Sequence, residues 1–130
     1  MIDHISIAVS NLPASADFYE KVFEPLGLMR IVERENTVGF GKKYPEFWLN
    51  ARPDMVATSA DTGDHICLRA PTRKAVVSFY ETAIALGGQG DGEPGERQAA
   101  VTTYFGAFIR DLDGNKIEAV TFPHSKTGGD

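Results

Sequence analysis

Two histidines in matching positions and one late glutamate are the residues of this sequence that best fit metal chemistry. His4-Ile5 recurs 61 residues later as His65-Ile66. A single histidine on a strand is more often structural or exposed than a ligand. A pair at the same place in a repeated unit is different, because a pseudo-twofold arrangement would bring both toward a common axis. Imidazole is the commonest protein metal ligand near neutral pH, so we expect His4 and His65 to bind a metal ion.

Glu118 is the best candidate for a third ligand. It lies in the otherwise apolar segment from Lys116 to Val120, where a carboxylate is costly unless it faces water, an opposite charge or a metal. The alternative is an edge strand with Glu118 in solvent, which Lys116 on the same face also allows. Two histidines and one carboxylate form a facial triad with open coordination positions, and open positions favour catalysis over a closed structural site.

The repeat also indicates where a fourth ligand would lie. Aligning residues 113–120 with residues 44–51 places Leu49 opposite Glu118, and leucine cannot bind a metal. Glu46 is out of register by three residues, which on a strand places it on the other face. We therefore expect three protein ligands, with water or substrate completing the coordination shell.

Further residues are candidates for substrate binding and proton transfer. Arg69 shares the face of His65 and could hold an anionic group through bidentate contacts, or form a salt bridge to a carboxylate in the cavity. Glu118 could be a base as well as a ligand, and Tyr104 is the candidate acid. Cys67 is expected to pack, with a soft metal ligand or a redox role as the alternative. Four side chains could line the cavity: Trp48, Asn50, Tyr104 and Phe108. Core packing is the alternative for each, and it suits Phe108 better than Tyr104.

The elements that must position these residues form a β-α-β-β-β unit that occurs twice. Strands are expected at residues 2–9 and 65–70, each with an aliphatic face for a helix and a histidine face toward a cavity. A helix follows each strand, because Phe18-Tyr19-Glu20 recurs as Phe79-Tyr80-Glu81 within stripes of helical spacing. Residues 87–97 contain five glycines and are predicted to be a loop with at most one short strand. The remaining predicted strands are 29–34, 37–41, 47–51, 102–110 and 116–122, with a hairpin turn at Asp113-Gly114.

Length and composition limit the class of protein. The 130 residues make one domain, with modules of about 1–60 and 61–124 and a polar tail at 125–130. A net charge of −5 without a basic run argues against binding to nucleic acid or anionic membranes. A single cysteine excludes an intrachain disulfide. No signal-peptide pattern or long apolar span is present, so a cytoplasmic location is expected.

The sequence resembles the vicinal oxygen chelate superfamily, which includes glyoxalase I, fosfomycin-resistance transferases, extradiol dioxygenases, methylmalonyl-CoA epimerase and bleomycin-resistance proteins. The resemblance rests on the opening segment 1–9, the Phe18-Tyr19 helix and the second strand with His65. Its most specific part is the closing Arg-Asp-x-Asp-Gly-Asn-x-Ile-Glu run at residues 110–118. It covers essentially the whole chain.

The resemblance implies an α+β fold in which two βαβββ modules form a half-open barrel around one divalent metal ion, such as iron, manganese, nickel or zinc. His4, His65 and Glu118 fall on three of the superfamily's ligand positions. The fourth, a glutamate in glyoxalase I, would fall near Trp48-Leu49 and is absent. In this superfamily the ion binds two neighbouring substrate oxygens and stabilises the charge that develops on them.

Two classes of function follow from the resemblance. The first is a small metal-dependent lyase, isomerase, transferase or dioxygenase acting on a small molecule. The second is a metal-free small-molecule-binding protein of the bleomycin-resistance type. The three retained ligand positions favour the enzyme. Members of the superfamily are commonly dimers, so a homodimer is expected, and the sequence does not decide whether the modules pair within one chain or across two.

Overall fold

The chain folds into two β-α-β-β-β halves, as the sequence predicts. The computed structural model describes residues 1–123, and the predicted polar tail lies outside them. The elements of the first half are β1 (Ile5–Val9), α1 (Leu12–Phe23), the short 3-10 helix η1 (Glu24–Leu26), β2 (Met29–Glu33), β3 (Thr37–Gly41) and β4 (Pro45–Ala51). The second half contains β5 (Ile66–Arg69), α2 (Arg73–Ala85), β6 (Gln89–Gln98), β7 (Thr103–Arg110) and β8 (Lys116–Thr121).

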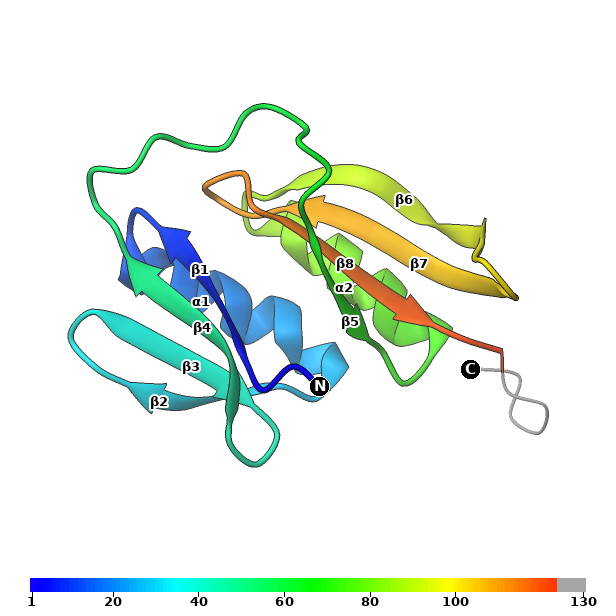
Figure 1. Ribbon diagram of the computed structural model, residues 1–130, viewed down its shortest axis with the longest axis horizontal. Helices are drawn as coiled ribbons and strands as arrows, with labels where there is room; N and C mark the ends of the chain where they lie inside the picture. Colours follow the sequence, from blue (N-terminus) through cyan, green and yellow to red (C-terminus); the bar gives the residue numbers. More distant parts are fainter. Residues whose placement is uncertain (124–130) are drawn as a thin grey trace.

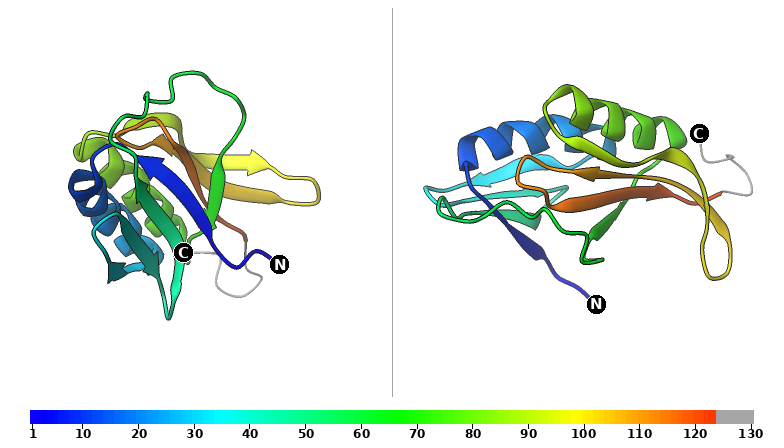
Figure 2. Two further views of the ribbon diagram at one scale, coloured as in Figure 1. Left: turned by 60° about the vertical axis from the view of Figure 1, so that its left-hand side comes forward. Right: turned by 90° about the horizontal axis from the view of Figure 1, so that it is seen from above.

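Each half contains one four-stranded sheet with the same topology. The strand orders are β1-β4-β3-β2 and β5-β8-β7-β6, so β1 and β5 each form an edge of their sheet (Figure 1). β1 runs parallel to β4 and β5 runs parallel to β8, whereas the other pairs are antiparallel. Both helices cover the same side of the two sheets and leave the opposite side open (Figure 2). We call that uncovered side the open face.

The covered side of the sheets contains the hydrophobic core. Tyr19 and Phe23 of α1 pack on Phe47 of β4, with ring centroids 5.4 and 4.8 Å apart. The side chains of Asn11 and Thr72 accept hydrogen bonds from first-turn N–H groups of α1 and α2, at 3.1 and 3.0 Å. Both helices therefore begin where capping side chains stand and bury the stripes that the sequence predicts.

The segment predicted as a loop is a long strand. β6 spans Gln89–Gln98 and pairs antiparallel with β7, with register shifts between Gly90 and Gly92 and between Gly92 and Gly95. Gly92 has a φ of +156°, which L side chains rarely adopt. Pairing with β7 overrides the low strand propensity of glycine, and the glycines mark the irregular positions of an edge strand.

The turn between β7 and β8 holds the two halves together. Gly114 adopts a φ of +88° there, as the predicted Asp113-Gly114 hairpin requires. The Tyr19 hydroxyl donates to Asp111 Oδ2 at 2.6 Å, and the Ser10 hydroxyl donates to Asp113 Oδ1 at 2.5 Å. These contacts place the end of β1 next to the start of β8, and thereby fix how one sheet lies beside the other.

A candidate metal and substrate site on the open face

Glu118 lies at the centre of the open face of the second sheet. Its neighbours across the sheet are Cys67 on β5 and Phe108 on β7. Glu118 is only 4% exposed, although its side chain points away from the helices. Its Oε1 is 3.3 Å from His65 Nε2, and its Oε2 accepts a hydrogen bond from the Tyr104 hydroxyl at 3.2 Å. The structure therefore brings three of the predicted site residues together.

The imidazole of His65 is oriented by its second nitrogen. Nδ1 lies 3.0 Å from the carbonyl oxygen of Gly63. Because a carbonyl oxygen only accepts hydrogen bonds, Nδ1 carries a proton and the neutral ring has its lone pair on Nε2, toward Glu118. Metal-binding histidines are commonly held in this way through the nitrogen that does not bind the metal. The His65 and Glu118 side chains thus fit a divalent ion as two of its ligands.

Glu118 places a negative charge at the centre of this group of side chains. Its ion pair within residues 1–123 is with His65, and no lysine or arginine pairs with it there. Burial, followed by the negative charge of Glu118, raises the pKa of Cys67 to about 12. The same two causes raise the pKa of Tyr104. Both groups are therefore protonated at neutral pH, and the Cys67 side chain is a neutral thiol on the open face rather than a core residue.

His4 lies away from this group within the chain. It is exposed, and its Nδ1 is 2.7 Å from Asp3 Oδ1. No three His, Cys, Asp or Glu side chains in the described part of the chain are placed to share a metal ion. The end of β1 lies beside the start of β8, since the Asn115 side chain donates to the carbonyl of Ala8. His4 and His65 each precede a strand, and within residues 1–123 of one chain they lie apart from each other. The shared metal site with His4 stays a prediction.

The strand register shows that the first-half residue corresponding to Glu118 is not the predicted Leu49. In the second half Cys67 pairs with Glu118, and in the first half Ser6 pairs with Trp48. Trp48, and not Leu49, is therefore the counterpart of Glu118. Leu49 is fully buried on the helix side. Glu46 alternates with Trp48 and lies on the same face, two residues away, contrary to the prediction.

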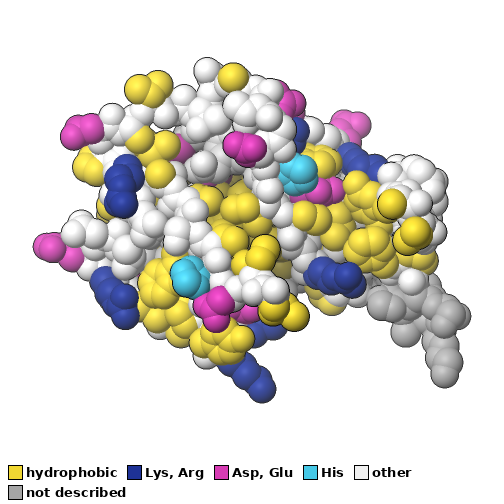
Figure 3. Space-filling view, in the orientation of Figure 1, with side chains coloured by type: hydrophobic (Ala, Val, Ile, Leu, Met, Phe, Trp, Pro, Cys, Tyr) yellow, Lys and Arg dark blue, Asp and Glu magenta, His cyan; other side chains and the backbone are white. Residues whose placement is uncertain are grey.

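The other predicted substrate residues divide between the two sheets. Arg69 is exposed on the open face of the second sheet, with its guanidinium 4.8 Å from the Phe122 ring centroid. Phe108, for which core packing is the alternative to lining the site, is half-buried on the open face, where its ring lies 5.3 Å from that of His65. Trp48 and Asn50 lie on β4, in the first sheet. Figure 3 shows hydrophobic side chains along the middle of the open face, with the histidines as two separate patches.

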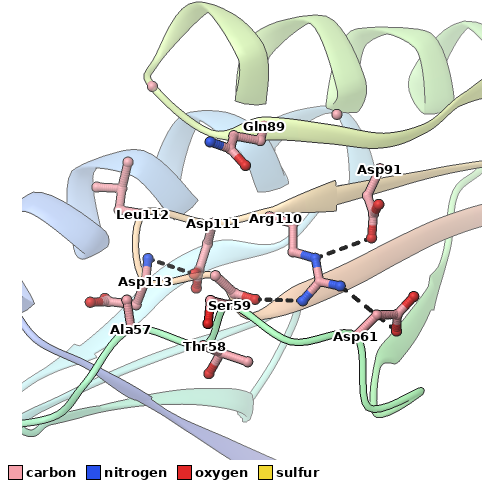
Figure 4. A pocket seen from close by; sticks show the side chains of 13 residues that line it. Ala57, Thr58, Ser59, Asp61, Gln89, Asp91, Arg110, Asp111, Leu112 and Asp113 are labelled. Atoms are coloured by element: carbon pink, nitrogen blue, oxygen red, sulfur yellow. Dashed lines mark hydrogen bonds and ion pairs between the residues drawn. The ribbon is translucent and has the colours of Figure 1, made fainter.

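A cavity of about 560 Å³ at one end of the second sheet is distinct from this site. Figure 4 shows the Arg110 guanidinium between Asp91 and Asp61, at N–O distances of 3.1 and 3.8 Å. Lys116 also contacts both carboxylates. These charges compensate one another, so the charged residues of this cavity are explained by the ion pairs that connect its walls.

Sequence reasoning missed Arg97, because it falls in the segment expected to be a loop. Once β6 is recognised as a strand, Arg97 pairs with Tyr104 on β7. Its guanidinium extends back along the sheet to 5.8 Å from the Phe108 ring centroid. The positive charge of Arg97 therefore belongs to the same open face as Glu118.

The fold and this face define a small α+β protein of two repeated modules with a carboxylate–histidine pair on an open sheet. The chain belongs to the Glyoxalase/Bleomycin resistance protein/Dioxygenase superfamily, whose family model matches residues 1–119. No curated protein sequence matches the chain. No helix within residues 1–123 is long and apolar enough to cross a membrane.

Solved structures share this fold. A glyoxalase/bleomycin resistance protein from Albidiferax ferrireducens T118 is 27% identical, with a TM-score of 0.81 over 92% of this chain and 97% of that one. A lactoylglutathione lyase from Agrobacterium tumefaciens is 19% identical, with a TM-score of 0.63 over 93% and 92% of the two chains. The fosfomycin resistance protein FosX from Listeria monocytogenes is 17% identical, with a TM-score of 0.65 over the same shares.

Proposed function

We propose that this chain is a small metal-dependent enzyme whose substrate presents two neighbouring oxygen atoms to a divalent ion. One observation supports the proposal above all others, namely the buried Glu118 carboxylate next to His65 Nε2 with no lysine or arginine to neutralise it within residues 1–123. A buried carboxylate is costly without a compensating positive charge. A divalent cation would supply that charge.

His65 and Glu118 would be two ligands of the ion, and His4 of the partner subunit would be the third. The contacts that hold the two halves of one chain together keep its own His4 away from its Glu118. His4 is exposed and lies next to β1, an edge strand. A twofold dimer presents the same surface from both chains, so each His4 would complete the site of the other chain.

The residues around the ligands indicate what the site does with a substrate. A bound iron, manganese, nickel or zinc ion would act as a Lewis acid toward substrate oxygens. The Tyr104 hydroxyl carries a proton and points at the carboxylate, so it would donate a hydrogen bond to a substrate oxygen or act as a proton source. Phe108 lies opposite Glu118 on the neighbouring strand, where its ring would form an apolar wall of the site. The reaction would be of the lyase, isomerase, transferase or dioxygenase type.

A metal-free binding protein is the second candidate, and one observation favours it. Both oxygens of Glu118 already have partners within one chain, His65 and Tyr104. The carboxylate is therefore satisfied without an ion if His65 is protonated. In that case the open face would bind a small molecule through its aromatic and arginine side chains.

Metal content by mass spectrometry on untagged protein tests the choice, with oligomeric state measured by light scattering. We expect one ion per chain in the wild type, loss in His4→Ala and Glu118→Ala, and no change in a control such as Glu96→Gln, which alters an exposed carboxylate. No metal after reconstitution, with folded variants, would overturn the enzyme and favour the metal-free protein.

Mixing the two variants that are expected to lose the metal tests the shared site. A mixed dimer of His4→Ala and Glu118→Ala chains has one intact site, made from the His4 of one chain and the Glu118 of the other. Random reassociation should restore about a quarter of the wild-type metal content, since about half of the dimers are mixed and each holds one site of two. No recovery would place all ligands within one chain.

A further inference from the structure

We propose that Arg97 and Arg69 form an oxyanion subsite on the open face that binds a carboxylate or phosphoryl group of the substrate. This inference takes one point from the proposed function, namely that the reacting end of the substrate lies near Glu118. The anion subsite is argued from the arginines themselves, so the two ideas can fail independently.

The guanidinium of Arg97 is fixed by main-chain carbonyls. It donates to the carbonyls of Glu93 at 2.7 Å and Gly95 at 2.9 Å, and also to that of Gly106. These bonds use three of the five N–H donors of a guanidinium, and no carboxylate within residues 1–123 forms an ion pair with it. Arg97 thus presents a full positive charge with unused donors in a fixed position.

Two glycines leave room for this arrangement. A Cβ added at Gly106 would lie 3.1 Å from the Tyr104 ring, and one added at Gly92 would lie 3.1 Å from Arg97 Nη2. Both distances are tighter than ordinary contacts, so side chains at these positions would press on the ring and the guanidinium. The glycines let Tyr104 and Arg97 lie along the sheet toward the middle of the open face.

Arg69 supplies a second cation on the other side of Tyr104. Its guanidinium lies 4.8 Å from the ring centroid of Phe122, which is 5.8 Å from that of Tyr104. Arg69 also forms no ion pair with the carboxylates of residues 1–123. Three other arginines each contact at least one carboxylate: Arg30, Arg73 and Arg110. In a chain of net charge −5, two uncompensated guanidiniums flanking one aromatic pair indicate an anionic ligand.

The chemistry of the face sets the orientation of that ligand. A guanidinium matches the planar edge of a carboxylate or phosphate with parallel hydrogen bonds. Glu118 repels negative charge, so the anionic group would lie at Arg97 and Arg69 while the oxygens that react face Glu118 and His65. The substrate class is therefore a small organic acid or phosphate ester whose charged group is separated from its reacting oxygens.

Titration with inorganic phosphate and, separately, acetate tests the subsite on the full chain by NMR. The side-chain Nε–Hε signals of Arg97 and Arg69 should shift with at least one anion, and the tighter of the two identifies the group. Arg97→Gln and Arg69→Gln should each weaken binding about tenfold, the effect of losing charge-assisted hydrogen bonds. Arg73→Gln, a matched control that pairs with Glu96 on the helix side, should bind as the wild type does.

The alternative to a ligand site is that Arg97 only braces the irregular strand β6. In that case Arg97→Gln would lower the thermal midpoint and leave anion affinity unchanged, which would overturn the proposal, as would the absence of shifts in both signals. Metal content measured on the same Arg97→Gln sample should equal that of the wild type. Anion binding without metal would refute the proposed enzyme and leave the subsite standing, and metal binding without anion binding would do the reverse.

Discussion

Replacing Tyr19 with phenylalanine tests how the two halves of the chain are held in place. Tyr19 is fully buried in α1, and its hydroxyl donates to Asp111 Oδ2 at 2.6 Å across the boundary between the halves. Asp111 is itself buried and accepts two backbone N–H bonds at its other oxygen, from Asp113 and Asn115. Tyr19→Phe removes this one donor and keeps the packed ring.

The expected cost follows from the partners that remain. Hydrogen bonds to a charged group contribute about 1.5–3 kcal/mol to stability. Asn115 Nδ2 also donates to Asp111 Oδ2, at 2.9 Å, so the carboxylate keeps a partner on the affected oxygen. We therefore expect Tyr19→Phe to lower the free energy of unfolding by about 2 kcal/mol at pH 7.5.

The pH dependence of this loss has a definite sign. Burial raises the pKa of Asp111, and the hydrogen bonds from Tyr19 and Asn115 oppose that rise. Removing the Tyr19 hydroxyl raises the pKa further, because the hydroxyl favours the ionised carboxyl. A raised folded-state pKa means that stability falls as pH rises through it. The difference between wild type and Tyr19→Phe should thus be larger at pH 7.5 than near pH 4, where a larger fraction of Asp111 is protonated.

Urea unfolding measures both effects. It is done at one fixed protein concentration, since the stability of the proposed dimer would depend on concentration. Tyr44→Phe is the matched control, because Tyr44 is exposed. An ordinary surface substitution changes the free energy of unfolding by no more than about 0.5 kcal/mol. If Tyr19→Phe and the control differ by no more than that, the Tyr19–Asp111 hydrogen bond does not stabilise the contact between the halves. A loss of equal size at both pH values would show that the bond does not act on an ionised carboxylate.

Four further substitutions have defined outcomes. Asn11→Ala removes the side-chain cap of α1 and should lower the free energy of unfolding in urea by about 1 kcal/mol. An unchanged free energy of unfolding would mean that water replaces the cap. Gly106→Ala adds a Cβ 3.1 Å from the Tyr104 ring, and should cost about 1–3 kcal/mol and displace the Tyr104 ring signals in NMR spectra, which an unchanged spectrum would contradict. Leu49→Ala should lower the free energy of unfolding by about 2–5 kcal/mol, and Trp48→Ala should lower it less, because Leu49 is fully buried and Trp48 is not. Urea unfolding followed by circular dichroism measures both losses, and the reverse order would contradict the strand register.

The repeated fold could be predicted because its signals are local. The aromatic stripe around Phe79, the cap at Thr72 and the glycine turn at Gly114 each follow from nearby residues, and all three lie where they were expected. The strand β6 could not be predicted in the same way. Its glycines are poor strand formers, and it exists because β7 offers backbone partners that no short window of sequence contains.

The candidate site could be predicted only within the second half. His65, Tyr104 and Glu118 lie on neighbouring strands, so their contact follows from correct pairing in one sheet. The separation of His4 from this group depends on how the halves are joined, through side chains such as Asp113 that bind Ser10 from far along the chain. A repeat in the sequence shows that two units are alike and leaves their relative orientation open.

The two halves share a fold but differ in chemistry at matching positions, and this difference predicts how many ions each chain binds. Where the second half has Cys67 paired with Glu118, the first has Ser6 paired with Trp48. The first half thus has no carboxylate at the strand position that matches Glu118, and the indole side chain of Trp48 has no lone pair to offer a metal. On the proposed function, mass spectrometry should find one ion per chain whether or not the sites are shared between subunits. Two ions per chain would require ligands outside these matched positions and would contradict the correspondence of Trp48 with Glu118 in metal binding.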